Sequence, residues 1–110
     1  MEKNIWITYL QRKIKENEKL LNQIEIFNLK FFLFGSAKNK ELPNDLDILL
    51  LYDNKMIDLE NLLNFKKEVV KFLFYLSSNI EIDLTILSIE EEVEIDFVKN
   101  EEAIFIIGKT

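Results

Sequence analysis

The chain has 110 residues, 48% of them hydrophobic, which is the size of one domain with one core, so we expect a single domain over residues 1–110. It has no cysteine and no histidine, which excludes disulfides, thiolate zinc sites, serine-histidine triads and zinc-protease motifs. Its formal net charge of −6 argues against broad nucleic-acid binding, because phosphate backbones are held mainly by clustered lysine and arginine.

The N-terminal segment, residues 1–27, carries apolar residues at helical spacing among lysine, glutamate and glutamine. These residues are Trp6, Leu10, Ile14, Leu21 and Ile24. They predict one amphipathic helix from about Trp6 to Ile26. Charges interrupt the short apolar stretches at the start of the chain, and nowhere do 18 apolar residues run together. We therefore expect no signal peptide, no membrane span and a cytoplasmic protein.

Two apolar runs follow, and both are typical of strands. The run LKFFLFG, residues 29–35, predicts a buried strand that ends at Gly35, and DLDILLLYD, residues 45–53, predicts a second strand. Because side chains alternate along a strand, Asp45 and Asp47 point to one side of the second strand. The apolar side of that strand is then free to meet the helices.

The rest of the chain predicts two helices and two strands. Residues 57–76 form the clearest helical pattern, with a predicted apolar stripe of Leu59, Leu62, Leu63, Val69, Leu73 and Leu76. Residues 79–87, NIEIDLTIL, alternate as a half-buried strand does, with Asp83 on the polar side. Ser88 and Glu91 predict a capping box that opens a short acidic helix to about Asn100, and residues 103–107 predict a last strand. The fold class is α/β (α+β), a small mixed β-sheet with helices packed mainly on one face.

Three carboxylates are expected to converge on this sheet. If the third strand buries its isoleucines under the same helices, Asp83 emerges on the same side as Asp45 and Asp47. Close carboxylates repel one another, and hard oxygen ligands select Mg²⁺ or Mn²⁺. Gly35 lets a ligand approach the backbone, and the Ser36 hydroxyl with the following N–H groups can hold a phosphate. This layout is typical of phosphoryl or nucleotidyl transfer.

Each part of the pattern also has a plainer interpretation. Taken alone, the Gly-Ser pair fits a tight turn, and the two aspartates of the second strand fit a solvated strand end. The acidic run 90–94 fits a charged first helical turn better than a second cation site, and Lys66, Lys67 and Lys71 fit a solvated helix face. The combination of all three aspartates with the Gly-Ser pair favours a metal and nucleotide site.

The stretch FGSAKNKELPNDLDILLLY followed by IEIDLTIL resembles the polymerase-β-like nucleotidyltransferase superfamily. It is most similar to the minimal nucleotidyltransferases (MNT), small domains often paired with a helical HEPN protein, and the resemblance covers about residues 29–107. It implies a Mg²⁺-dependent enzyme that transfers AMP from ATP to a hydroxyl of an acceptor. In HEPN-paired members the acceptor is a tyrosine of the partner toxin, which the modification silences, so the resemblance also implies an antitoxin of a toxin-antitoxin pair.

The resemblance assigns roles to five residues. It implies that Asp45 and Asp47 hold metal ions, that Asp83 completes the metal site and helps activate the acceptor hydroxyl, and that Gly35 and Ser36 bind the β- and γ-phosphates. The spacer AKNKELPN lacks the arginine and the further glycine of many members. An alternative therefore stays open, in which the same fold is weakly active or inactive and acts by binding a partner protein. A homo-oligomer formed through an edge strand or the first helix also stays open.

Overall fold

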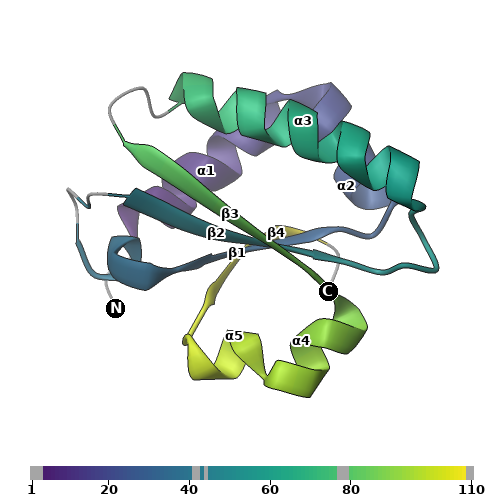
Figure 1. Ribbon diagram of the computed structural model, residues 1–110. Coiled ribbons are helices and arrows are strands. Elements are labelled where there is room, and N and C mark those ends of the chain that lie inside the picture. Colours follow the sequence, from purple (N-terminus) through teal and green to yellow (C-terminus); the bar gives the residue numbers. More distant parts are fainter. Residues whose placement is uncertain (1–3, 41–42, 44, 77–79, 109–110) are drawn as a thin grey trace.

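The computed structural model describes residues 4–40, 43, 45–76 and 80–108, which form a four-stranded mixed sheet with helices on both faces (Figure 1). The predicted α/β (α+β) class is thereby confirmed. The helices are α1 (Ile5–Glu16), α2 (Glu18–Ile26), the 3₁₀ turn η1 (Gly35–Lys38), α3 (Leu59–Leu76), α4 (Ile89–Ile95) and α5 (Phe97–Asn100). The strands are β1 (Lys30–Phe34), β2 (Asp45–Tyr52), β3 (Glu81–Ser88) and β4 (Ile104–Gly108).

The strand order is β3-β2-β1-β4, and β2 lies inside the sheet. Strand β1 pairs antiparallel with both β2 and β4, whereas β2 and β3 are parallel and are connected through α3. The four predicted strands are therefore confirmed within a residue or two at their ends. Asn79, the first residue of the predicted third strand, lies outside the described residues.

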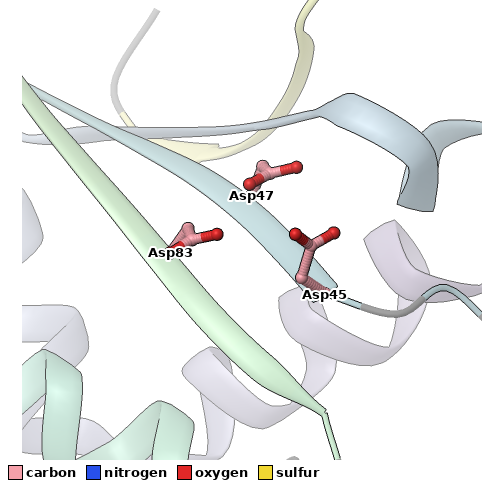
Figure 2. Close-up of side chains that lie close together, drawn as sticks. All are labelled: Asp45, Asp47 and Asp83. Carbon is pink, nitrogen blue, oxygen red and sulfur yellow. The ribbon is translucent and has the colours of Figure 1, made fainter.

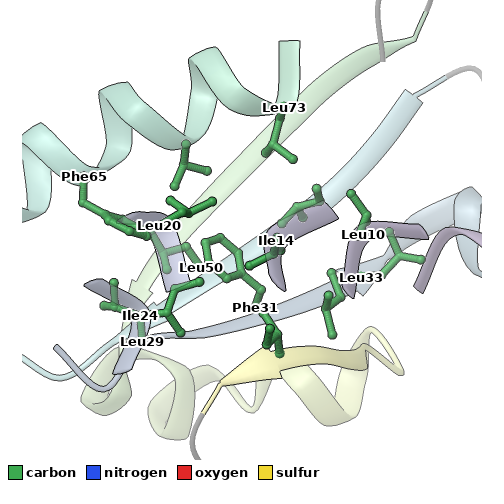
Figure 3. Packing of buried hydrophobic residues seen from close by; sticks show 14 of the residues in the cluster. Leu10, Ile14, Leu20, Ile24, Leu29, Phe31, Leu33, Leu50, Phe65 and Leu73 are labelled. Carbon is green, nitrogen blue, oxygen red and sulfur yellow. The ribbon is translucent and has the colours of Figure 1, made fainter. Parts of the chain in front are cut away.

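The main core lies between the sheet and the helices α1, α2 and α3, which cover one face (Figures 1 and 3). Figure 3 shows Phe65 of α3 and Phe31 of β1 within this layer, and their ring centroids are 6.2 Å apart. The short helices α4 and α5 lie on the other face, the face toward which Leu49 and Leu51 point and are buried. The helices thus pack mainly on one face, as predicted. The other face carries the aspartates at the start of β2 and is covered by a short helix near the end of that strand. Among the described residues, no helix has the length and apolarity needed to cross a membrane.

The prediction of one N-terminal helix is wrong, because the chain breaks at Asn17 into α1 and α2. Asn17 has an extended conformation, with ψ 91°, and its side chain accepts a hydrogen bond from the backbone N–H of Leu20. Asparagine is a strong N-cap residue, so it can end one helix and begin the next. Each short helix still buries an apolar stripe, with Leu10 and Ile14 in α1 and Leu20 and Ile24 in α2.

The acidic segment after β3 is also two helices rather than one. The predicted capping box is confirmed, since the Ser88 hydroxyl accepts from the Glu91 N–H at 3.1 Å and the Glu91 carboxylate accepts from the Ser88 N–H at 2.9 Å. Helix α4 then ends at Asp96, which adopts the left-handed conformation with φ 53°. Aspartate is one of the few residues other than glycine that enter this region readily, and its presence separates α4 from α5.

The predicted buried stripe of α3 is partly wrong. The residues that α3 buries are Leu62, Phe65, Val69 and Leu73. Leu59 and Leu63, by contrast, are 69% and 48% exposed. Because a helix turns roughly 100° per residue, the buried side chains share one arc, and Leu59 and Leu63 lie beside it rather than within it. The solvent side of α3 is consequently more apolar than the sequence predicts.

Candidate metal centre

The pairing of β2 with β3 brings the three predicted aspartates together. The parallel register places Asp47 directly opposite Asp83, and Asp45 precedes Asp47 by two residues on the same side of β2. One carboxylate oxygen from each residue lies within 4.8 Å of the other two. Figure 2 shows the three side chains on one side of the two strands. We call Asp45, Asp47 and Asp83 the aspartate cluster.

The carboxylates of the aspartate cluster repel one another when no cation is present. Burial raises the pKa of Asp47 above its ordinary value of 3.8, and the charges of Asp45 and Asp83, a hydrogen bond to the Asp83 carboxyl and the charge of Glu101 raise it further. Asp45 and Asp47 are half-buried and Asp83 is exposed. An ionised carboxylate disfavours ionisation of another one this close to it. A bound cation would therefore stabilise the ionised form of the cluster.

The donor set matches a hard divalent cation. It consists only of carboxylate oxygens, which suit Mg²⁺, Mn²⁺ and Ca²⁺ and are poor at selecting softer metals. The described residues bring these three carboxylates close enough together to hold a metal ion. Glu81 lies opposite Asp45 in the register but is exposed and is not part of the cluster.

The predicted Gly-Ser pair lies beside the aspartate cluster. Phe34, the last residue of β1, pairs with Asp47, so the turn η1 begins immediately next to that aspartate. Gly35 has a φ of +73°, and a Cβ atom built on it would collide with the Asp47 oxygen Oδ2. Only glycine combines this backbone conformation with so close an approach. Ser36 follows within η1, as the predicted helical turn requires.

Asn4 fastens η1 to the first helix, a role that the sequence did not reveal. Its side-chain oxygen caps α1 by accepting from the N–H groups of Trp6 and Ile7 at 2.8 and 3.1 Å. Its amide nitrogen donates to the carbonyl oxygens of Ala37 and Lys38 at 3.0 and 2.7 Å. An asparagine before a helix signals a cap, but nothing in the sequence signals the second pair of bonds.

Lys38 holds the other side of η1 against the end of α5. Its ammonium donates to the carbonyl oxygen of Glu101 at 2.7 Å and to that of Glu102 at 3.3 Å. Phe34 and Phe97 make an edge-to-face contact nearby, with ring centroids 5.0 Å apart. These contacts bring α5 and Glu101 toward the aspartate cluster, which explains how Glu101 acts on Asp47 across more than 50 residues of sequence.

Comparisons with protein-family models, with curated proteins and with solved structures found no significant match to this chain.

Proposed function

We propose that this chain is a Mg²⁺-dependent nucleotidyltransferase that transfers AMP from ATP to a hydroxyl group of an acceptor protein. The aspartate cluster carries the proposal, because three carboxylates from two adjacent strands approach one another within 4.8 Å. The glycine turn beside Asp47 supports it, since Gly35 lets the backbone approach the Asp47 carboxylate closely and so brings η1, which carries Ser36, directly beside the cluster. The resemblance of these motifs to the minimal nucleotidyltransferases suggests the reaction and the nucleotide.

The metal would be held by Asp45, Asp47 and Asp83. A bound Mg²⁺, or Mn²⁺ in its place, would neutralise these carboxylates and stabilise the negative charge of the phosphates during transfer. Burial, followed by the charges of Asp45 and Asp83, raises the pKa of Asp47, and this observation fits such an ion because a cation would favour the ionised carboxylate.

The residues of the chain have separate tasks in this reaction. Gly35 and Ser36 would bind the β- and γ-phosphates of ATP through backbone N–H groups and the serine hydroxyl. The acceptor oxygen forms a bond to the α-phosphorus while the bond from that phosphorus to the oxygen bridging to the β-phosphate breaks. AMP is thereby transferred and pyrophosphate leaves. The proton of the acceptor hydroxyl would pass to a carboxylate, and Asp83 is the exposed member of the cluster.

The acceptor would be a protein side chain, with a tyrosine of a HEPN-type toxin as the leading candidate. The resemblance to HEPN-paired members supports this acceptor. In that case the chain is the antitoxin of a toxin-antitoxin pair, and it acts by adenylylation in the cytoplasm.

A second candidate function is a weakly active or inactive module that binds its partner without modifying it. One observation favours it: Lys38, a cation of the spacer after Gly35-Ser36, donates its hydrogen bonds to the backbone at the end of α5. A lysine engaged in this way contributes less to the binding of a triphosphate than a free one would. Partner binding alone would then account for inhibition.

The two candidates separate in one experiment. The protein is incubated with Mg²⁺, ATP labelled at the α-phosphate and the protein encoded by the neighbouring gene, and transfer of label is measured beside complex formation. The enzyme predicts labelling that is lost in D45N/D47N. The control E90Q/E94Q removes the same number of charges from exposed positions outside the cluster, and it should retain labelling. Complex formation without any labelling of the partner would reject the enzyme and favour the binding module.

A further inference from the structure

The solvent side of α3 carries an apolar stripe that no other part of the described chain covers. Its members are Leu59, Leu63, Val70 and Phe74, which are 69%, 48%, 45% and 68% exposed. We call these four residues the outer stripe. At roughly 100° per residue they fall within an arc of about 60° and extend over about 22 Å of helix. They expose on the order of 400 Å² of apolar surface, a size at which a patch becomes a candidate interface.

The outer stripe lies on the side of α3 that faces away from α1 and α2. Glu68 of α3 forms an ion pair with Lys19 of α2 at 2.9 Å, which identifies the side turned toward the first two helices. The stripe lies roughly 150° around the helix from Glu68. Helix α1 lies over the β4 edge, where Gln11 donates to the carbonyl oxygen of Ile106 at 2.8 Å, so the free side of α3 faces the β3 edge. Figure 1 shows α3 and β3 together at the near side of the molecule.

The β3 edge is also incompletely covered. Ile82, Leu84 and Ile86 point toward the helices and pack against the core, yet all three are only partly buried. β3 is an edge strand, and none of the helices in the described part of the chain lies beyond it to complete this layer. The outer stripe and the β3 edge therefore border the same uncovered rim of the core.

Lysines flank the outer stripe on both sides. At roughly 100° per residue, Lys66 falls on one border of the stripe, and Lys67 and Lys71 fall on the other. All three are exposed, and the ion pairs of the described residues do not include them. Glu60, in the first turn of α3, is also exposed and falls on the border of Lys67 and Lys71, so the two borders together carry three lysines and one glutamate. In a chain with a net charge of −6, this is still a local positive surface around an apolar centre. A helix with carboxylates on both sides of its own apolar stripe complements such a surface.

A second copy of the chain fits the outer stripe poorly. Two copies packed antiparallel about a two-fold axis would place Lys66 and Lys67 of both copies together near the axis, where like charges repel. The acidic helix α4 exposes Val93 and Ile95, but it has only 7 residues and would cover less than half of the stripe.

We propose that the outer stripe and its flanking lysines bind an amphipathic helix of a partner protein, one whose apolar stripe is bordered by glutamate or aspartate. The partner helix lies along α3 over the β3 edge. The surface shares no residue with the aspartate cluster, so this proposal does not rest on the proposed function.

The test uses two synthetic helical peptides of about 18 residues, long enough to span α3. Both carry leucines at positions i, i+4, i+7 and i+11. One has glutamates and the other has lysines on both borders of the leucines. Binding to the labelled full chain is followed by NMR at low ionic strength. We expect saturable shifts at the outer stripe and an affinity for the glutamate peptide about tenfold higher, because three ion pairs each contribute a few-fold.

Two sets of variants make the test decisive. K66E/K67E/K71E should reverse the preference between the peptides, and L63D/F74D should abolish binding. V93D, which places one such charge on an exposed valine of α4, should leave peptide binding unchanged, as should D83N in the aspartate cluster. All these sites are exposed, and thermal unfolding verifies that each variant is folded.

Three results would overturn the proposal. The first is no saturable binding of either peptide up to about 1 mM, which corresponds to only about 4 kcal/mol of binding free energy. The second is equal affinity for both peptides. The third is a different occupant of the stripe, shown by dimerisation or by binding to phosphatidylglycerol vesicles that is lost in L63D/F74D. D45N/D47N should lose nucleotidyl transfer and still bind the glutamate peptide, because the outer stripe shares no residue with the aspartate cluster.

Discussion

Replacement of Gly35 by alanine tests the close packing of η1 against the aspartate cluster. Alanine at φ +73° costs about 1 kcal/mol or somewhat more in backbone strain alone. The new Cβ also collides with Oδ2 of Asp47, so the carboxylate must turn away, and a displaced side chain costs about another 1 kcal/mol. We therefore expect G35A to lower the free energy of unfolding by about 2 kcal/mol.

A double-mutant cycle separates the two contributions. Urea unfolding in EDTA is measured for the wild type, G35A, D47A and G35A/D47A. The D47A variant removes the carboxylate that meets the new Cβ, so Gly35→Ala should cost only about 1 kcal/mol in that background. The difference of about 1 kcal/mol is the collision with Asp47. An equal cost in both backgrounds, or no cost in either, would mean that the carboxylate does not occupy this space.

Three further changes test the electrostatics, the cap and the core. The pKa of Asp47 is raised, chiefly by burial, so ionisation of this carboxyl destabilises the fold as pH rises from 3.8 through the higher folded value. D47N in EDTA should remove this decline and raise the free energy of unfolding at pH 7. Unchanged pH dependence of unfolding would contradict it. S88A removes the capping box of α4 and should cost about 1 kcal/mol in urea unfolding, whereas a neutral result would mean that the cap is not formed in solution. F65A leaves a cavity between α3 and the sheet and should cost about 3–5 kcal/mol, and a loss below about 1 kcal/mol would contradict the buried position of Phe65.

The aspartate cluster could be predicted because it depends on strand alternation. Two carboxylates separated by one residue in a strand must share a side, which places Asp45 next to Asp47 without any knowledge of the fold. Asp83 required one further assumption, that its strand buries its isoleucines under the same helices. The parallel pairing of β2 with β3 satisfies that assumption and sets Asp83 opposite Asp47. The sequence alone did not specify which strands are neighbours.

The features that escaped prediction depend on single polar residues or on distant contacts. Asn17 and Asp96 each separate two helices. The apolar spacing continues on both sides of each residue, so this spacing alone predicts one helix where the structure has two. The bonds of Asn4 to η1 join residues 33 and 34 positions apart, and those of Lys38 to the end of α5 join residues 63 and 64 apart. No local pattern carries such information.

The packing of a helix on the aspartate side of the sheet could have been predicted from the sequence of β2. Its sequence is polar on that side only at Asp45 and Asp47, and the same side continues with Leu49 and Leu51. Apolar residues on both sides of a strand indicate that both faces are buried. The presence of α4 over this half of the sheet is the consequence.

The two tethers of η1 bear on the order in which the protein assembles during synthesis. Asn4 is synthesised well before η1 and Glu101 well after it, yet both are bonded to the same short turn. The carboxylates of β2 and β3 can meet once residue 83 has been made, whereas the hydrogen bonds from Lys38 require residues 101 and 102. A nascent chain can thus bring its acidic ligands together before the turn beside them is fixed in place.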